Sequence, residues 1–335
     1  MQPLLLLFVS LLATPVFGQG MTEVQVGSRP GAGGPPDEVR VRFGLIDIVD
    51  VDDRRQRFSI DAFVEVHWRD RRLASSTVNG TEWRTLPVSD IWTPRLLILN
   101  NRGLQTTLPM VATVDGAGNV VLRQRLAGPL ATDLELRDFP FDSQTLAIDI
   151  GSYQYSPSEV VFSSDSELIA RTDAFRSKGW SFETLEPEHS VYRIAEDGRG
   201  TSLLRYSVRA QRKSVFYALT LALPMTLILF LAWLVHWMPP QVIPPRIGMS
   251  SATVFSLIAL GVSFRLTLPA IDYLTRADRF VMLSTLLVAV SLAVTVFASS
   301  RASRDQLDVA NRVSARMRQL FPVAYGLIVL ATLIN

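Results

Sequence analysis

The segment "PPRIGMSSATVFSLIALGVSFRLTLP", residues 244–269, decides how the rest of the chain is interpreted. It is apolar enough to cross a bilayer, since about 20 helical residues span the roughly 30 Å hydrocarbon layer. It nevertheless begins with Pro244 and Pro245, is rich in Gly, Ser and Thr, and contains Arg246 and Arg265 but no carboxylate. Because an arginine in a membrane segment is costly unless it faces water, this segment indicates a functional role.

Around this segment, the 335-residue chain divides into two parts of different composition. From about residue 37 to 211 it is polar, charged and strand-like, and from residue 215 it is dominated by long apolar runs. The formal net charge is only +2, but no Asp or Glu occurs between Asp197 and Asp272. Two domains are therefore expected. The absence of cysteine excludes disulfides and thiol chemistry.

The first residues, "MQPLLLLFVSLLATPVFG" (1–18), predict a secretory signal peptide, because an apolar core is followed by small residues. An uncleaved membrane anchor is the alternative interpretation, and either one exports the domain that follows. Residues 19–36 contain "RPGAGGPP" and predict a flexible leader, since such a composition cannot bury a core.

Residues 37–211 show the period-2 alternation of half-buried strands. In "RFSIDAFVEVHW" one face is apolar, whereas the other face carries Phe63 and Glu65 among polar residues. Asp-Gly pairs in "VDGAGN" (114–119) and "EDGRG" (196–200) predict hairpin turns. The pattern predicts an extracellular antiparallel β-sandwich whose last strand runs directly into the apolar region.

The apolar region, 212–335, predicts a bundle of four transmembrane helices at about 213–237, 244–266, 278–300 and 312–334. The connection before the last helix is basic and satisfies the positive-inside rule, with Arg301, Arg304, Arg312, Arg316 and Arg318. The loop at 267–277 and the C-terminus are then expected on the same side of the membrane as the sandwich.

Several motifs in the right order identify a family: "WRDRRLA" (68–74), "IWTP" (91–94), "DFPFDSQTLAI" (138–148), "LALP" (221–224), "TLP" (267–269) and "LFP" (320–322). The chain resembles the pentameric ligand-gated ion channels, the Cys-loop receptor superfamily, in their short prokaryotic form. The cysteines that close the family's namesake loop would fall at Thr132 and Leu146, so packing is expected to hold that loop. The resemblance implies a β + α membrane protein that forms a homopentamer in the bacterial inner membrane, with the sandwich outside.

The resemblance implies that the second helix lines the pore, with rings of Arg246 at the inner mouth and Arg265 at the outer one. "PPRIG" is similar to the Pro-Ala-Arg-Val-Gly segment of glycine and GABA receptors, and Pro245 stands where cation-selective members have glutamate. Basic rings favour anions, so chloride selectivity is expected. In the alternative interpretation Arg246 reaches lipid headgroups or caps the helix, and selectivity is set elsewhere.

The family register places five residues along the lumen: Gly248, Ala252, Phe255, Ala259 and Val262. Phe255 would then form a hydrophobic gate, since an apolar constriction can close a pore by dewetting. Periodicity alone leaves open a competing polar stripe of Ser250, Thr253 and Ser256, in which case Phe255 is an ordinary packing residue.

In the family, an arginine at the head of the first helix pairs with acids from two loops below the sandwich. Arg212, Asp53 and Asp142 match those positions, with Pro269 and Tyr273 as their contact on the loop after the pore helix. This cluster is expected to couple the two domains; the alternative is a set of solvated charges of little energetic value.

The resemblance also implies an agonist site between neighbouring sandwiches. Its candidates are Phe63, Glu65, Arg123, Arg125, Tyr153, Tyr155 and Tyr192, because aromatic rings attract ammonium groups and arginines bind carboxylates. Packing and surface roles are the alternative for each tyrosine. Proton gating is the other option, and it would use His67, His189 or the sandwich carboxylates, since the pore helix has no His or Glu and His236 is expected at the membrane interface.

Other functional classes fit less well. No catalytic set, metal-ligand cluster or phosphate loop is present, so no enzyme, cofactor or nucleic-acid partner is expected. The predicted partners are the other subunits, a small-molecule or proton agonist, permeant anions and the bilayer. A cation-selective channel of the same family and a non-conducting membrane-tethered sensor remain alternatives.

Overall fold

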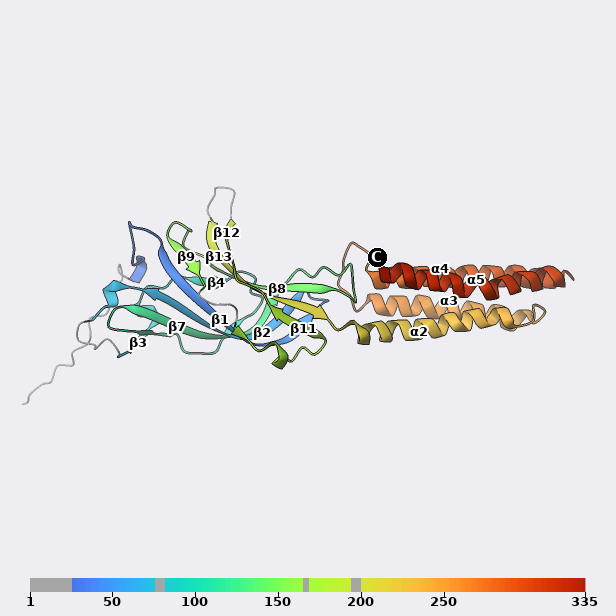
Figure 1. The fold of residues 1–335 in the computed structure, drawn as a ribbon, viewed down its shortest axis with the longest axis horizontal. Coiled ribbons are helices and arrows are strands. Elements are labelled where there is room, and N and C mark those ends of the chain that lie inside the picture. Colours follow the sequence, from blue (N-terminus) through green and yellow to red (C-terminus); the bar gives the residue numbers. More distant parts are fainter. Residues whose placement is uncertain (1–25, 76–81, 165–168, 194–199, 335) are drawn as a thin grey trace, which may run out of the picture.

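The computed structural model describes residues 26–75, 82–164, 169–193 and 200–334. The predicted signal peptide (1–18), the first part of the predicted leader and the Asp197-Gly198 turn lie outside these residues. Figure 1 shows an elongated molecule in which a β-sandwich is followed, along the long axis, by a bundle of helices. The predicted fold class is confirmed.

Within the described residues, two sheets form the sandwich. The first sheet has the order β10-β1-β2-β7-β6-β3, with β9 on β1 and β5 on β7, and the second has the order β11-β13-β8-β4, with β12 on β13. The strands are β1 (Asp37–Asp52), β2 (Arg57–Arg69), β3 (Arg84–Pro87), β4 (Leu96–Ile98), β5 (Gln105–Thr106), β6 (Val111–Val114), β7 (Asn119–Ala131), β8 (Ser143–Ser152), β9 (Val160–Ser163), β10 (Ile169–Ala170), β11 (Trp180–Thr184), β12 (Glu188–Arg193) and β13 (Gly200–Arg212).

The alternation in the sequence decides which side chains enter the core. The apolar face of β2 is at most 4% exposed at every position: Phe58, Ile60, Ala62, Val64, Val66 and Trp68. The intervening residues face outward, including Phe63, which is 42% exposed. Because successive side chains of a strand point to opposite faces, the same pattern that buries the core also presents an outer row on β2.

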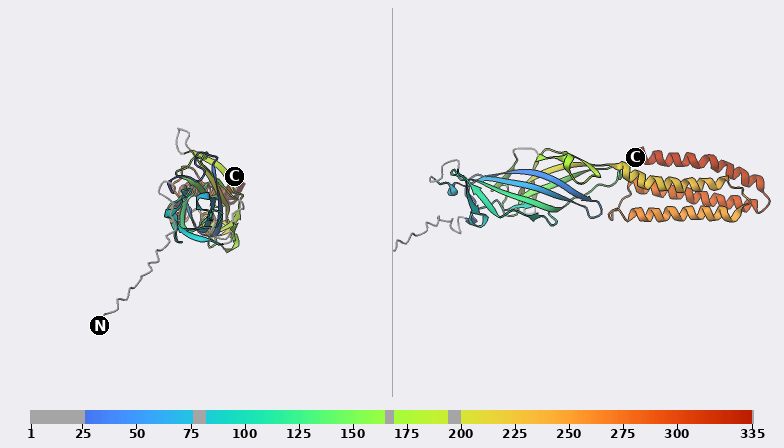
Figure 2. Two further views of the ribbon diagram at one scale, coloured as in Figure 1. Left: turned by 90° about the vertical axis from the view of Figure 1, so that its left-hand side faces the viewer. Right: turned by 90° about the horizontal axis from the view of Figure 1, so that it is seen from below.

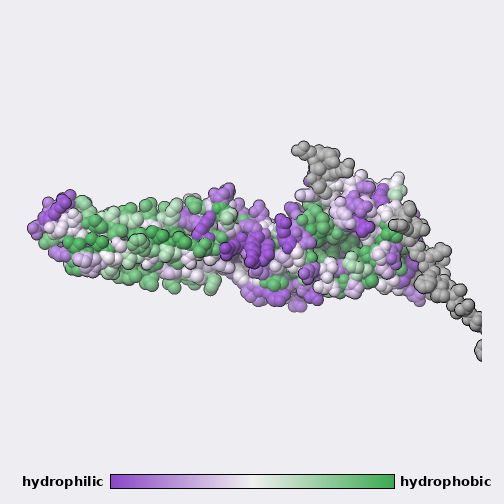
Figure 3. All heavy atoms as spheres, turned by 180° about the vertical axis from the view of Figure 1, so that it is seen from behind, coloured by the Kyte–Doolittle hydropathy of each residue, from purple (hydrophilic) through white to green (hydrophobic). Residues whose placement is uncertain are grey.

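The bundle consists of α2 (Ser214–Leu234) with a short 3₁₀ extension, α3 (Ile243–Arg265), α4 (Arg276–Ala302) and α5 (Leu307–Ile334). The helices α2, α3 and α4 are long and apolar enough to cross a membrane. Figure 3 shows apolar side chains covering the bundle between a hydrophilic tip and a hydrophilic belt at the sandwich. The right-hand view of Figure 2 separates the helices, and the C-terminus lies at the sandwich end of the bundle.

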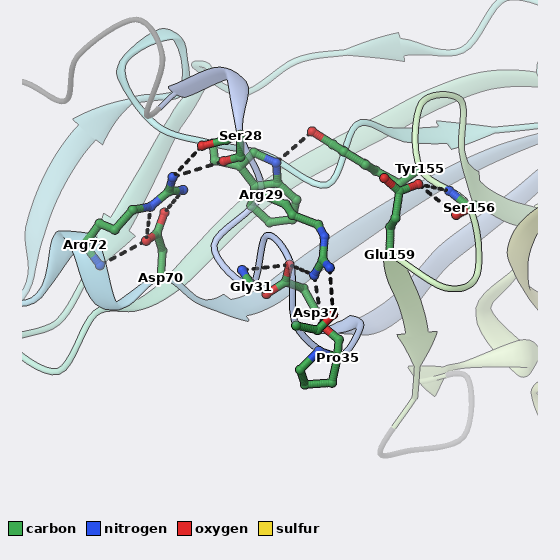
Figure 4. Close-up of polar contacts among 12 residues, drawn as sticks. Ser28, Arg29, Gly31, Pro35, Asp37, Asp70, Arg72, Tyr155, Ser156 and Glu159 are labelled. Carbon is green, nitrogen blue, oxygen red and sulfur yellow. Dashed lines mark hydrogen bonds and ion pairs between the residues drawn. The ribbon is translucent and has the colours of Figure 1, made fainter.

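Residues 26–36, part of the predicted flexible leader (19–36), contact the sandwich in the structure. Arg29 forms an ion pair with Asp37 at 3.0 Å, and Arg72 donates to the carbonyl and hydroxyl oxygens of Ser28 at 3.1 and 3.2 Å (Figure 4). The backbone N–H of Gly31 donates to the Asp37 carboxylate. Arg29 and Arg72 thus connect this Gly- and Pro-rich segment to the sandwich through the ion pair and hydrogen bonds given above.

Candidate functional site

An ion-pair cluster lies where the sandwich meets the bundle. Arg212, the last residue of β13, donates from Nε to Asp142 at 2.7 Å and from both Nη atoms to Asp53 at 2.7 and 2.8 Å. The side chains of Arg212 and Asp142 are each 1% exposed, whereas that of Asp53 is 17% exposed. Burial disfavours the charged form, but the bonds to both carboxylates outweigh it and raise the pKa of Arg212.

Three aromatic rings enclose the same guanidinium. The Cζ atom of Arg212 lies 4.1 Å from the ring centroid of Trp180, 4.7 Å from that of Phe139 and 5.3 Å from that of Tyr217. We call Arg212, Asp53, Asp142 and these three rings the junction cluster. It joins the β1–β2 turn, the loop before β8, strand β11 and the first turn of α2, so it connects both sheets to the first membrane helix.

The loop at residues 132–142 reaches from the sandwich to the helices. The Tyr273 hydroxyl accepts from the backbone N–H of Leu136 at 3.0 Å, and Arg276 at the start of α4 donates to Asp138 at 2.8 Å. Phe139 packs against the rings of Tyr217 and, at 6.1 Å, Phe264 near the outer end of α3. The loop therefore contacts three helices. Pro269 is buried in the α3–α4 connection.

Hydrogen bonds from two glutamines hold this loop. The backbone N–H of Leu134 donates to Gln56 Oε1 at 2.7 Å. Gln144 accepts from the N–H of Glu135 at 3.0 Å and donates to its carbonyl at 2.8 Å. Leu146, at one of the two family cysteine positions, is fully buried. Packing and hydrogen bonds from the glutamine side-chain amides thus hold the loop without a disulfide.

Helix α3 presents one uncharged face outside the bundle. The five residues that the family register assigns to the lumen are all exposed in the isolated subunit: Gly248, Ala252, Phe255, Ala259 and Val262. Phe255 is 70% exposed. Ser250 and Thr253 are buried, and Ser250 lies 3.4 Å from Thr295 of α4. Ser256 is exposed, so only this one member of the competing polar stripe lies on the exposed surface.

Arg246 is buried within its own subunit and is not on the exposed face of α3 that carries the predicted lumen residues. Its side chain is 0% exposed, and Nη2 donates to Ser314 on α5 at 3.1 Å. Pro244 and Pro245, in the first turn of α3, are exposed instead. A residue one position further along a helix is rotated by about 100°, so the prolines can face outward while the arginine faces inward. His236, expected at the interface, is also 0% exposed and bonds to Ser291 at 2.8 Å.

Arg265 is ion-paired, which corrects the expectation that no acid offsets it. Nη1 donates to Asp278 at 2.7 Å, and Nη2 donates to the carbonyl of Ile271 at 3.1 Å. Asp278 also accepts from the N–H and hydroxyl of Thr275, which form a capping box at the start of α4. The acid lies in the next helix, so it was missed when the pore segment was considered alone.

The outer face of the first sheet carries four of the predicted ligand residues. Arg125 makes two bonds to Asp61 at 2.9 and 2.7 Å, and its guanidinium lies 5.7 Å from the Phe63 ring centroid. Glu65 accepts from Arg123 at 2.6 Å and lies 3.3 Å from His67. These arginine hydrogen bonds lower the pKa of Asp61 and of Glu65.

The three tyrosines divide between two environments. Tyr155 is 8% exposed, and its hydroxyl accepts from Trp92 Nε1 at 2.8 Å, which favours the packing alternative for this residue. Tyr153, after β8, and Tyr192, in β12, are 59% and 49% exposed. Tyr192 lies in the second sheet and Tyr153 directly follows a strand of it, whereas Phe63 lies in the first sheet.

Sequence reasoning missed Trp180, Asp278 and the Arg276–Asp138 pair. The spacing from Thr275 to Asp278 is a helix-start signal that could have located the acid. Trp180 carried no pattern that would have placed its ring on Arg212, because the contact joins residues far apart in the chain.

The chain matches two family models. One is described as the neurotransmitter-gated ion-channel ligand binding domain and covers residues 19–214; the other is described as the neurotransmitter-gated ion-channel transmembrane region and covers residues 221–325. A proton-gated ion channel of Gloeobacter violaceus is 27% identical over 312 residues, which is 93% of this chain and 85% of that protein. The gamma-aminobutyric acid receptor subunit alpha-2 of Bos taurus and that of Homo sapiens are each 26% identical over 269 residues, 76% of this chain and 58% of each receptor subunit.

Proposed function

Since the chain belongs to the neurotransmitter-gated ion-channel family, with its extracellular ligand-binding domain and transmembrane helices, we propose that it forms a homopentameric, agonist-gated channel that conducts anions. Family members are pentameric channels gated by ligands or protons. The proposed location is a bacterial inner membrane, with the sandwich on the periplasmic side.

The exposed face of α3 is the observation on which this proposal depends. It carries small and apolar side chains and no Asp or Glu, and it is not covered by the other helices of its own subunit. Five such faces around one axis would enclose a pore. Phe255 would form the hydrophobic constriction, which suits closure by dewetting.

Three features support anion selectivity after the corrections to Arg246 and Arg265. The first turn of α3 has no acidic residue, so five helix N-termini would bring positive partial charge to the inner mouth. Pro245 occupies the position where the resemblance expects glutamate in cation channels. No described carboxylate pairs with Arg246, so no acidic side chain there adds negative charge near the inner mouth. Arg265 contributes less, because Asp278 neutralises it.

The proposed agonist site lies between neighbouring sandwiches. Phe63, Glu65, Arg123 and Arg125 would come from one subunit, and Tyr153 and Tyr192 from the next. The separation of these groups on two sheets supports an intersubunit pocket. The junction cluster and the 132–142 loop are the proposed route from that pocket to α3, because they contact both the strands and the helices.

Proton gating is the second candidate for the stimulus, and the similarity to a proton-gated channel over 93% of the chain favours it. A voltage-clamp experiment separates these possibilities. Currents evoked by small amines, small carboxylates or pH steps are recorded under a chloride gradient, and the reversal potential is expected to follow chloride. A reversal potential that follows sodium would exclude anion selectivity, and no current under any condition would favour the tethered-sensor alternative.

A further inference from the structure

The guanidinium of Arg246 is buried with most of its hydrogen-bonding capacity unused. Nη2 donates to Ser314, but Nε and Nη1 have no partner among the described residues. The side chain is 0% exposed, so within its own subunit it is closed off from both the exposed face of α3 and the bilayer. Burying a cation without a counter-charge or hydrogen bonds is costly.

Ser299 is a second buried polar group with unused capacity, and it lies at the level of Arg246. Ser250 contacts Thr295, and Arg246 and Ser299 are each one turn from that contact toward the inner end, because α3 and α4 are antiparallel. The Ser299 hydroxyl is buried and has no partner in the described part of the chain. One turn in the other direction, Ser291 bonds to Nε2 of His236, whose Nδ1 is also unpaired within the described ranges.

The charges around this region are positive. Arg318 on α5 donates to the carbonyl oxygen of His236 at 3.0 Å, and its Cζ atom lies 4.7 Å from the Trp237 ring centroid. Among the described carboxylates of the bundle, Asp278 is bound to Arg265 at the opposite end, and Asp305 and Asp308 are exposed at the inner tip. None of them forms an ion pair with Arg246 or Arg318 in the described structure.

The polar groups without a hydrogen-bond partner indicate what kind of ligand could bind beside Arg246. Arginine nitrogens only donate, and a serine hydroxyl can donate. A partner must therefore accept hydrogen bonds, and the uncancelled guanidinium favours a negative charge. The guanidinium carries a single positive charge, and its neighbours on α4 and α5 are uncharged serine and threonine side chains. A ligand with one negative charge would therefore balance the site.

We propose that the inner part of each subunit's bundle holds one small monovalent anion, of which chloride is the example, with Arg246 as its main donor and Ser299 beside it. The site lies inside the subunit and outside the proposed permeation path. It therefore does not depend on whether the channel conducts anions or cations.

Diffraction from crystals of the full-length protein grown in bromide tests this directly. Bromide has a usable anomalous signal, and a peak is expected within hydrogen-bonding distance of the Arg246 guanidinium in every subunit. Density that refines as water and shows no anomalous signal would overturn the proposal.

A second measurement uses the thermal stability of the purified protein titrated with chloride against gluconate at constant ionic strength. Stabilisation is expected to be saturable in the wild type, since a ligand that binds only the folded state raises Tm. Ser299→Ala should raise the midpoint chloride concentration about tenfold, the loss of one bond to a charged group, and Arg246→Gln should abolish the effect. Ser300→Ala, at the exposed neighbouring position, should leave the midpoint unchanged. Equal chloride dependence in the wild type and both site variants would exclude the site.

Discussion

Arg212 is the residue on which the contact between the two domains depends most. Two carboxylates and three aromatic rings surround its side chain, which is 1% exposed. Removing one partner of a buried ion pair costs more than the pair itself contributes, because the remaining charges stay buried and unpaired.

We therefore expect Arg212→Gln to destabilise the protein by about 3–5 kcal/mol, the usual cost of breaking a buried pair. The measurement is unfolding of the purified protein by heat or denaturant. Arg209→Gln is the matched control, because Arg209 pairs with Glu183 on the surface, with side chains 53% and 67% exposed. That variant should change stability by less than about 1 kcal/mol. Similar losses in both variants would contradict the special role of the junction cluster.

The acid dependence of the outer sheet face can also be predicted. Hydrogen bonds from Arg125 and Arg123 lower the pKa of Asp61 and Glu65 below their unfolded values. The stability that these carboxylates add is therefore present above their unfolded pKa, near 4, and is lost as the pH falls through the folded value. Glu65→Gln should flatten the decrease in Tm between about pH 5 and pH 3. An unchanged slope would show that Glu65 is not stabilised by Arg123.

At the scale of elements, the helices and strands were largely predictable from the sequence. The expected second helix, 244–266, differs by one residue at each end from α3. The fourth helix begins at Leu307 rather than at about residue 312, because its first turns are polar and gave no apolar signal.

The direction of individual side chains on α3 was harder to predict. The apolar lumen positions are on the exposed face, but Arg246 faces inward and Arg265 is neutralised. The partners responsible, Ser314 and Asp278, lie on α5 and α4, so no inspection of the segment alone could reveal them. The burial of Tyr155 was hidden for the same reason: its partner, Trp92, is 63 residues away.

The proposed hydrophobic gate, Phe255, lies on helix α3. Phe255→Ala should leave channels that conduct in the absence of agonist, because a ring of methyl groups is too wide and too weakly apolar to exclude water. The measurement is resting conductance in planar bilayers or oocytes. Thr253→Ala, on the buried side of the same helix, is the control and should not increase the leak. Closed-state conductance equal to that of the wild type would remove Phe255 from this role.

The α3–α4 connection gives a second prediction. Asp278→Asn should free Arg265 at the outer end of α3 and raise single-channel chloride conductance, since the positive charge there is no longer paired. It should also weaken the cap of α4 by about 1 kcal/mol. The exposed acid Asp272 provides the control as Asp272→Asn. A chloride conductance that falls or stays constant in Asp278→Asn would indicate that Arg265 does not face the conduction path.

At the scale of the whole molecule, the outer faces of the two sheets are incomplete in one subunit. Phe63 and Tyr153 are exposed on different sheets. In a pentamer, the face of one subunit would meet the opposite face of the next. The absence of cysteine in the chain allows this to be tested without background thiols.

A double variant, Phe63→Cys with Tyr153→Cys, should form covalent multimers up to pentamers with a bifunctional thiol reagent, as seen by denaturing gel electrophoresis. The single variants should remain monomeric on the same gel. Crosslinked monomers without multimers would place both positions within one subunit and would argue against the intersubunit pocket.

Only Lys213 separates β13 from α2, and its backbone N–H is bonded to the carbonyl of Gly179 at 2.8 Å. No flexible linker therefore separates the β-sandwich from the helix bundle at this point. Any rotation of β13 must appear either as a tilt of α2 or as strain at this one residue. Inserting a few glycines next to Lys213 would preserve the sandwich and the bundle but would uncouple the movement of β13 from that of α2. The short connection between β13 and α2 is therefore part of how a signal would be transmitted.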